Sequence, residues 1–272
     1  MSSSINEDLK IIYDLGANVG DNLPYYLKKS DLVVAVEANP ILADEIKTRF
    51  SKEIASGHLV VEAFVLTTSK SDSEVPFYIH NEGHALSQFP QPGETEINKF
   101  TKILLPSINV VDLVNKHGTP YYIKVDIEHY DAIILSELFR NNIRPPFISA
   151  ESHSIDVFCT LVSEGHYKAF TLVNGYTMHI DYSNSKINGG LENFEFPMYS
   201  SGPFGEDLKD SWMTPENFFL YLSNEGLGWK DIHATNLIQP NPNLKADEMS
   251  YALKRVLKKI TPKLFRPIFG LN

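Results

Sequence analysis

One apolar segment carries charged side chains at alternating positions, where they could do acid–base chemistry. In the segment Tyr121–Ile127 and the residue after it, the charged side chains are those of Lys124, Asp126 and Glu128. Residues two apart on a strand point to the same face, and buried charges are costly unless they are paired. We therefore expect this strand to end in a crevice at the carboxyl edge of a sheet, where open α/β sheets bind ligands. The alternative is an ion pair between Lys124 and Asp126 that only closes the sheet edge.

Glu151 and His153 have the same two-residue spacing at the end of a second apolar segment, Pro146–Glu151. If the two segments form neighbouring strands, both side chains lie near Asp126. A histidine with an ordinary pKa near 6.5 is a suitable general base, and a carboxylate could orient it. The same group of side chains could instead hold a hard divalent cation, Mg²⁺ or Mn²⁺, that acidifies a hydroxyl group; its ligands would be Asp126, Glu128, Glu151 and His153. The spacing does not separate these two schemes.

A turn with two glycines follows the first apolar segment, Leu9–Leu15, and reads Asp14-Leu-Gly-Ala-Asn-Val-Gly20. Glycine lets the backbone turn sharply and approach a ligand closely. Glu37 ends the next apolar segment, where an acidic residue can accept both ribose hydroxyls of an adenosine cofactor. The turn has no third glycine of the kind that dinucleotide-binding turns carry. A cofactor without a pyrophosphate, S-adenosylmethionine, therefore fits better than a nicotinamide dinucleotide. The alternatives are a site for that dinucleotide and a turn with a purely structural role.

Short apolar strands alternate with helical stretches in the first half of the chain, as in a parallel sheet covered by helices. The predicted strands are Leu9–Leu15, Asp31–Glu37, Leu59–Leu66, Tyr121–Ile127 and Pro146–Glu151, with further strands at Val75–His80 and Ile108–Leu113, and the predicted helices are Leu23–Lys29 and Ile41–Ser56. Asn174-Gly175 is a strong hairpin signal, so we expect Tyr167–Val173 and Tyr176–Tyr182 to pair as an antiparallel hairpin at the end of the sheet.

The composition divides the chain into three parts. Residues 1–182 form the predicted core, and residues 183–245, rich in Gly, Asn, Pro and aromatic residues, form an irregular appendage on the substrate side. Within it, Ser201–Glu206 and Trp212 are candidates for a wall that stacks on a sugar. Residues 246–272 are predicted to form a basic amphipathic helix, which either packs on the core or contacts an anionic membrane surface or a partner.

The overall composition excludes several classes of protein. The chain has 272 residues, a formal net charge of −10 and one cysteine, so an intrachain disulfide is impossible and binding to nucleic acid is disfavoured. Its N-terminal residues lack the basic and apolar regions of a signal peptide, and no apolar run approaches the roughly 18 residues of a membrane span. We expect a cytoplasmic enzyme, with the inner face of a membrane as a second location, and the sequence does not fix its oligomeric state.

The ordered motifs resemble FkbM-type S-adenosylmethionine-dependent methyltransferases over roughly residues 9–180. The matching segments are Asp14–Gly20, Val36-Glu37-Ala-Asn-Pro40, Ile123–Glu128 and Ser149–His153. The resemblance implies a Rossmann-like class I methyltransferase core with a mostly parallel seven-stranded sheet, and O-methylation of a sugar, a nucleotide sugar, a glycan precursor or a similar small metabolite. It also implies a cofactor site made by Asp14, Gly16, Asn18, Gly20, Glu37 and Asn39. The chain has His129-Tyr130-Asp131 where the family usually continues with Gly and a further Glu. A non-catalytic scaffold that keeps this core is the remaining alternative.

Overall fold

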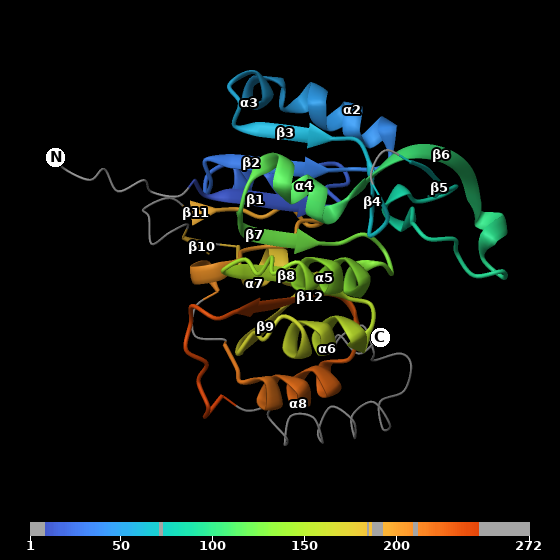
Figure 1. Ribbon diagram of the computed structural model, residues 1–272. Coiled ribbons are helices and arrows are strands. Elements are labelled where there is room, and N and C mark those ends of the chain that lie inside the picture. The colour runs from blue at the N-terminus through green and yellow to red at the C-terminus, as the bar shows by residue number, and fades with distance from the viewer. Residues whose placement is uncertain (1–8, 71–72, 184, 187–192, 209–211, 245–272) are drawn as a thin grey trace, which may run out of the picture.

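The computed structural model describes residues 9–70, 73–183, 185–186, 193–208 and 212–244 and is built on a seven-stranded sheet (Figure 1). The strand order is β3–β2–β1–β7–β8–β12–β9. Strand β12 runs antiparallel to both of its neighbours, and the other pairs are parallel. This confirms the predicted α/β fold with a mostly parallel seven-stranded sheet that ends antiparallel. The strands span Ile11–Leu15 (β1), Leu32–Val36 (β2), Leu59–Glu62 (β3), Pro120–Val125 (β7), Phe147–Ser152 (β8), Ala169–Asn174 (β9) and Gly228–Thr235 (β12).

The strand order reverses between β1 and β7. From β1 the chain proceeds outward to β2 and β3, and it then returns to β7 on the other side of β1. The loops after β1 and β7 therefore leave the sheet in opposite directions and open a crevice between the carboxyl ends of these two strands. The candidate site residues lie at or just after the carboxyl ends of β1, β2, β7 and β8.

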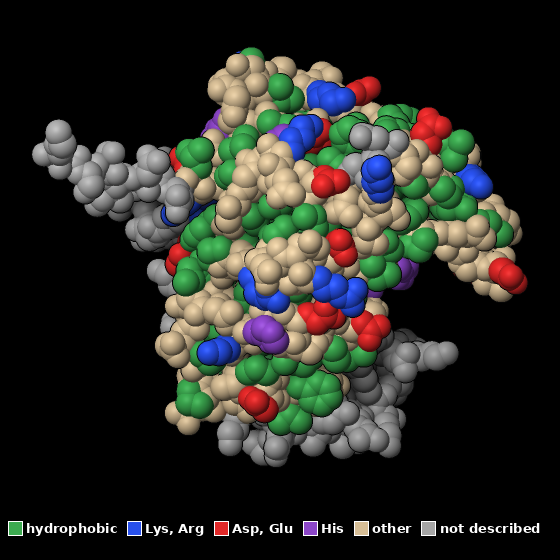
Figure 2. Space-filling model, in the orientation of Figure 1, with side chains coloured by type: hydrophobic (Ala, Val, Ile, Leu, Met, Phe, Trp, Pro, Cys, Tyr) green, Lys and Arg blue, Asp and Glu red, His purple; other side chains and the backbone are tan. Residues whose placement is uncertain are grey.

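Helices cover both faces of the sheet, because successive side chains of each strand point to opposite faces. Ile11, Tyr13 and Leu15 pack toward one face, while Ile12 packs toward the other. The first face is covered by α4 (Val110–His117), α5 (Asp131–Arg140), α6 (Ile155–Ser163) and α8 (Pro215–Glu225), as Figure 1 shows. The second is covered by α1 (Leu23–Tyr26), α2 (Pro40–Arg49), α3 (Ser51–Ala55), α7 (Met178–Asp181) and residues 193–208 with Trp212. On the face drawn in Figure 2, acidic and basic side chains are interspersed among apolar ones.

The chain between β3 and α4 forms a small second sheet. Its strand order is β4–β6–β5, with bounds Val65–Thr67 (β4), Glu74–His80 (β5) and Phe100–Asn109 (β6), and short 3₁₀ helices at His84–Leu86 and Ile97–Lys99 lie between β5 and β6. The strand predicted at Val75–His80 is confirmed as β5. The strand predicted at Leu59–Leu66 is divided between β3 and β4. The strand predicted at Ile108–Leu113 is wrong, because the Asn109 side chain accepts the Val111 N–H at 2.8 Å and starts helix α4.

The predicted hairpin is also wrong, although its turn is present. The Asn174 side chain accepts the Tyr176 N–H at 3.0 Å, and the chain then enters the short helix α7. The antiparallel partner of β9 is β12, which lies between β8 and β9 in the sheet. Residues 183–245 were predicted to be irregular, but they supply α8 and β12 together with β10 (Ser185–Lys186), β11 (Asn193–Phe194) and a 3₁₀ helix at Gly205–Asp207. The sheet is therefore not complete at residue 182.

The candidate sugar-stacking wall is part of the hydrophobic core. Phe204 is fully buried and stacks on Tyr122 with ring centroids 3.9 Å apart, and Trp212 is 4% exposed. These two aromatic rings are therefore not available to a ligand. The predicted basic helix at 246–272 lies outside the described residues. Within the ranges that the structure describes, no helix is long and apolar enough to cross a membrane.

Candidate active site

The turn after β1 is held against the end of β7 by a close approach of two backbones. Gly16 has a φ of +89°, and a Cβ added there would lie 1.7 Å from the Asp126 carbonyl oxygen. The Gly16 N–H donates to the Val36 carbonyl at 3.0 Å, and the Asp126 N–H donates to the Leu15 carbonyl at 2.9 Å. The backbone conformation and the lack of space both require glycine at this position.

Glu37 links this turn to the start of α2. Its two carboxylate oxygens accept the N–H groups of Asn18 at 2.7 Å and Asn39 at 2.8 Å. Burial raises the pKa of Glu37 to about 7, although both hydrogen bonds act in the opposite direction. The Asn39 side chain caps α2 by accepting the Ile41 N–H at 3.1 Å, so Asn39 contributes its backbone, and not its amide group, to the Glu37 side of the site.

A pocket lies beside Glu37 along the carboxyl edge of the sheet. Its polar end is formed by Gly16 and Glu37, and its apolar walls include Phe64, Phe89 and Tyr130. The rings of Phe89 and Tyr130 meet edge to face with centroids 5.1 Å apart. Residues from the small second sheet and its loop therefore close one side of a pocket whose other side is the glycine turn after β1.

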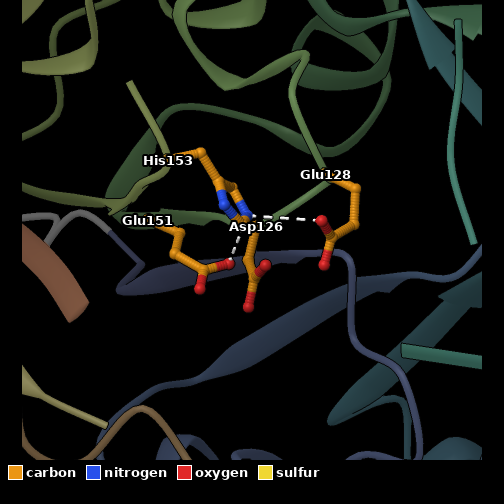
Figure 3. A group of neighbouring side chains, drawn as sticks. All are labelled: Asp126, Glu128, Glu151 and His153. Carbon is orange, nitrogen blue, oxygen red and sulfur yellow. Dashed lines mark ion pairs between the residues drawn. The ribbon is translucent and has the colours of Figure 1, made fainter. Parts of the chain in front are cut away.

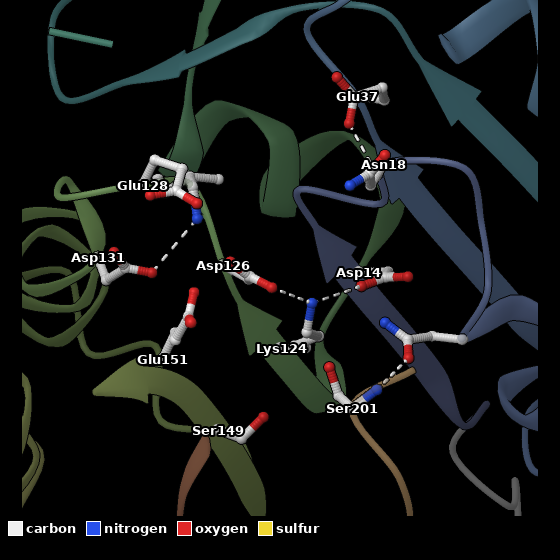
Figure 4. Close-up of polar contacts among 12 residues, drawn as sticks. Asp14, Asn18, Glu37, Lys124, Asp126, Glu128, Asp131, Ser149, Glu151 and Ser201 are labelled. Carbon is white, nitrogen blue, oxygen red and sulfur yellow. Dashed lines mark hydrogen bonds and ion pairs between the residues drawn. The ribbon is translucent and has the colours of Figure 1, made fainter. Parts of the chain in front are cut away.

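Lys124 on β7 lies at the centre of a buried charge network (Figure 4). Its Nζ lies 2.7 Å from an Asp126 oxygen and 3.9 Å from an Asp14 oxygen. Burial alone would lower the pKa of Lys124, but the carboxylates of Asp126, Asp14 and Asp231 outweigh it and hold that pKa above its usual range. Burial raises the pKa of Asp14 to about 6 and that of Asp231 to about 7.

Four of the predicted side chains converge at the ends of β7 and β8 (Figure 3). One ligand atom from each of them lies within 4.8 Å of those of the other three; they are Asp126, Glu128, Glu151 and His153. The His153 Nε2 atom lies 2.8 Å from a Glu151 oxygen and 3.4 Å from a Glu128 oxygen. Burial would lower the pKa of His153, but its contact with Glu151 and the charge of Glu128 raise it to about 9.

Burial first, and repulsion by Asp126 second, raise the pKa values of two carboxylates of this group, so the site retains protons near neutral pH. Burial raises the pKa of Glu128 to about 7. Burial and the nearby Asp126 also raise the pKa of Glu151. Lys124 lowers the pKa of Asp126 against the effect of burial, so this carboxylate keeps its negative charge. The cluster could therefore act as a base, or it could bind a cation in place of the protons.

The loop after β7 is strained where it enters the site. Glu128 and His129 both have positive φ angles, of 50° and 66°, although neither is glycine. The His129 ring lies 4.9 Å from the His153 ring, centroid to centroid. Such left-handed conformations persist only when the surroundings impose them, and here they bring Glu128 next to His153.

The structure brings together side chains that were predicted to lie close to one another, and it adds one buried member of the network that was not predicted. Asp14, Gly16, Asn18, Gly20 and Glu37 lie in or beside one turn, and the four charged residues form one cluster, as predicted. Asp231, which faces Lys124 from β12, was missed because the sequence analysis placed it in an irregular segment. The period-two pattern Asp-Ile-His-Ala-Thr at the end of β12 is the signal that could have found this strand.

The chain was compared with known families and structures. A family model described as Methyltransferase FkbM domain matches residues 14–168. A search of curated proteins found no match. Among solved structures, a precorrin-6y C5,15-methyltransferase from Geobacter metallireducens is 12% identical, with a TM-score of 0.36 and coverage of 83% of this chain and 78% of that one. A putative tRNA (m1A22) methyltransferase, Sp1610 from Streptococcus pneumoniae, is 8% identical, with a TM-score of 0.38 and coverage of 96% and 77%. Residues 961–1257 of StiE O-MT are 11% identical, with a TM-score of 0.37 and coverage of 94% and 76%.

Proposed function

The chain belongs to the FkbM methyltransferase family and is an S-adenosylmethionine-dependent methyltransferase, and we propose that it methylates a hydroxyl group of a sugar, a nucleotide sugar or a glycan precursor. The observation that carries this proposal is the position of His153. It lies between two carboxylates at the ends of β7 and β8, on the same sheet edge as the glycine turn. The net charge of −10 also favours a small acceptor over a nucleic acid.

The residues around the turn fit the cofactor. Both carboxylate oxygens of Asp14 and the amide oxygen of Asn18 are buried without a hydrogen-bond partner among the residues that the structure describes. Such acceptors suit the ammonium and hydroxyl donors of S-adenosylmethionine. Glu37 would accept the ribose hydroxyls, because it lines the pocket beside the glycine turn. When bound, the cofactor supplies an electrophilic methyl group on a positively charged sulfur.

We assign His153 the role of general base. A sugar hydroxyl is a weak nucleophile until its proton is removed, and the His153 imidazole could accept that proton at the nitrogen that does not face the carboxylates. Glu151 and Glu128 flank Nε2 and would stabilise the imidazolium that results. Because only neutral imidazole can accept a proton and the pKa of His153 is about 9, the rate should rise as the pH approaches 9.

A divalent cation is the competing scheme at the same four side chains. Three carboxylates and an imidazole within 4.8 Å of one another are suitable ligands for Mg²⁺ or Mn²⁺. In that scheme the four side chains would hold the cation in place of the protons that the cluster retains, and its positive charge would lower the pKa of the acceptor hydroxyl group. The pH optimum would then lie well below 9.

Transfer of a labelled methyl group from S-adenosylmethionine to a panel of nucleotide sugars tests the function. His153→Ala should lower turnover by about 10²–10⁴-fold without changing the affinity for S-adenosylhomocysteine, while the exposed loop variant His84→Ala serves as the control. Activity that EDTA abolishes and Mg²⁺ or Mn²⁺ restores would establish the cation scheme. Full activity of His153→Ala would exclude both schemes at this residue, and binding of neither S-adenosylhomocysteine nor acceptor would indicate a non-catalytic scaffold.

A further inference from the structure

Three aromatic side chains cluster on the surface near the end of β12. The Tyr199 ring stacks on Trp229 at a centroid distance of 6.0 Å and an interplanar angle of 25°, and the Tyr176 ring meets Trp229 edge to face at 5.0 Å. Tyr199 is 72% exposed and Tyr176 is 65% exposed. A Cβ at Gly175 would lie 2.6 Å from the indole, so the glycine lets Trp229 lie directly on the backbone. We refer to Tyr176, Tyr199 and Trp229 as the aromatic platform.

The register of the sheet places this platform at the edge that carries the proposed active site. Gly228, which precedes Trp229, pairs with Ser152, and Ser152 precedes His153. Lys230, which follows Trp229, pairs with Asn174 at the carboxyl end of β9. Since neighbouring strands lie about 4.8 Å apart, the backbone at Trp229 lies within roughly two strand spacings of that at His153.

A buried contact ties the two segments of the platform to the Lys124 network. Asp231 contacts Ser201, and it also faces Lys124. Trp229 precedes Asp231 by two residues on β12, and Tyr199 precedes Ser201 by two residues on the facing segment. The platform therefore lies next to the Lys124 network, on the same two segments and at the same edge of the sheet.

The chemistry of the platform suits an uncharged ring with one apolar face. Tyr and Trp combine a flat apolar surface with a polar O–H or N–H group, which matches the C–H face and the hydroxyl rim of a sugar. Lys230 does not offer a counter-charge for a phosphate, because its ammonium group already donates to the carbonyls of Glu225 at 2.5 Å and Gly226 at 2.8 Å. The observations favour a sugar ring over a phosphate or a nucleotide.

We propose that the aromatic platform binds a second sugar ring of the acceptor, so that the enzyme acts on a disaccharide or a longer glycan. This inference rests on the proposed function, because it takes the methylated sugar to lie at His153. The platform then holds the neighbouring ring while the methylated ring lies at His153. Uniform binding by a remote ring should lower KM for long acceptors and leave kcat for the methylated ring nearly unchanged.

Tryptophan fluorescence tests the platform independently of catalysis. The chain has two tryptophans, and Trp212 is buried, so Trp212→Phe leaves Trp229 as the reporter. Titration with malto-, cello- and chitohexaose should change the Trp229 emission and saturate for at least one of them. Tyr199→Ala in the same background should weaken that binding by about fivefold or more, whereas Phe219→Ala, an exposed aromatic on α8, should not. The proposal would be overturned if Trp212→Phe and its two further variants bound the hexasaccharides equally well. It would also be overturned if UDP changed the Trp229 emission and no hexasaccharide did.

Kinetics separates failure of the platform from failure of the proposed function. Tyr199→Ala should raise KM for an oligosaccharide acceptor by about fivefold or more, with kcat and the KM for the matching monosaccharide unchanged. Because Tyr199 is exposed, this variant should keep the melting temperature of the wild type, and an unchanged KM in a folded variant would refute the platform. If hexasaccharides bind at Trp229 but no sugar is methylated, the proposed function is wrong and the platform still binds sugars.

Discussion

Replacing His129 with glycine should relieve strain in the loop after β7 and at the same time disturb the proposed active site. His129 adopts a φ of 66°, and a left-handed conformation costs a non-glycine residue about 1–2 kcal/mol. Glycine removes that cost but loses about 0.5–1 kcal/mol more backbone entropy on folding than alanine does. His129→Gly should therefore be about 0.5–1 kcal/mol more stable than His129→Ala, which removes the same ring and keeps the strain.

Calorimetry and urea unfolding of the two variants measure this difference. For a domain of this size, 1 kcal/mol corresponds to about 2–4 °C in melting temperature, so His129→Gly should melt about 1–4 °C above His129→Ala. Equal melting temperatures would mean that the left-handed conformation costs nothing, and the inference of strain would be wrong.

The same substitution should release Glu128 from His153. The strained backbone holds a Glu128 oxygen 3.4 Å from His153 Nε2, and the charge of Glu128 contributes to the raised pKa of His153. With glycine at 129 the loop gains freedom, so the pKa of His153 should fall from about 9 toward its ordinary value, and methyl transfer should decrease more than in His129→Ala. An NMR titration of the His153 ring needs no acceptor and checks the first effect. An unchanged pKa and full activity in His129→Gly would show that the strained turn does not position Glu128.

Three further substitutions test the cofactor turn and the buried charges. Glu37→Ala should weaken binding of S-adenosylhomocysteine about tenfold or more in calorimetric titration, because a hydrogen bond to a charged group contributes about 1.5–3 kcal/mol. The control Glu45→Ala, at an exposed position, should bind as the wild type does. The affinity of the wild type should also fall below pH 7, because Glu37, with a pKa of about 7, then takes up a proton. Lys124→Met should cost about 3–5 kcal/mol of unfolding free energy, because it leaves buried carboxylates without their counter-charge. This loss of unfolding free energy should be larger at pH 8 than at pH 5, because the buried carboxyl groups, with their raised pKa values, take up protons in the folded state at the lower pH. An equal loss at both pH values would argue against this cause. Gly16→Ala should cost at least about 2 kcal/mol and abolish cofactor binding, because its Cβ would meet the Asp126 carbonyl at 1.7 Å; near wild-type unfolding in urea would contradict the close approach.

Local patterns predicted the elements that form the cofactor turn and the charged cluster. A two-residue period in a strand fixes which side chains share a face, so the grouping of Asp126 with Glu128 and of Glu151 with His153 could be read from spacing alone. Their proximity needed one further assumption, that β7 and β8 are neighbours, and the sheet confirms it.

Long-range pairing could not be predicted in the same way. The Asn174-Gly175 signal describes a turn, and a turn is present, but the course of the chain beyond it depends on which segment pairs with β9. Strand β12 comes from far along the chain and pairs with β9 in place of the segment that follows the turn. The left-handed angles at Glu128 and His129 had no signal either, because residues other than glycine seldom adopt them.

The place of β12 in the sheet has a consequence for any shortened form of the protein. The family match ends at Lys168, one residue before β9 begins, so the last two strands of the sheet, β12 and β9, lie beyond it. A fragment cut at that boundary would leave the backbone N–H and C=O groups of β8 unpaired along a buried apolar strand. Such an edge is a template for intermolecular strand pairing, so this fragment should aggregate, and expression should extend at least through Thr235.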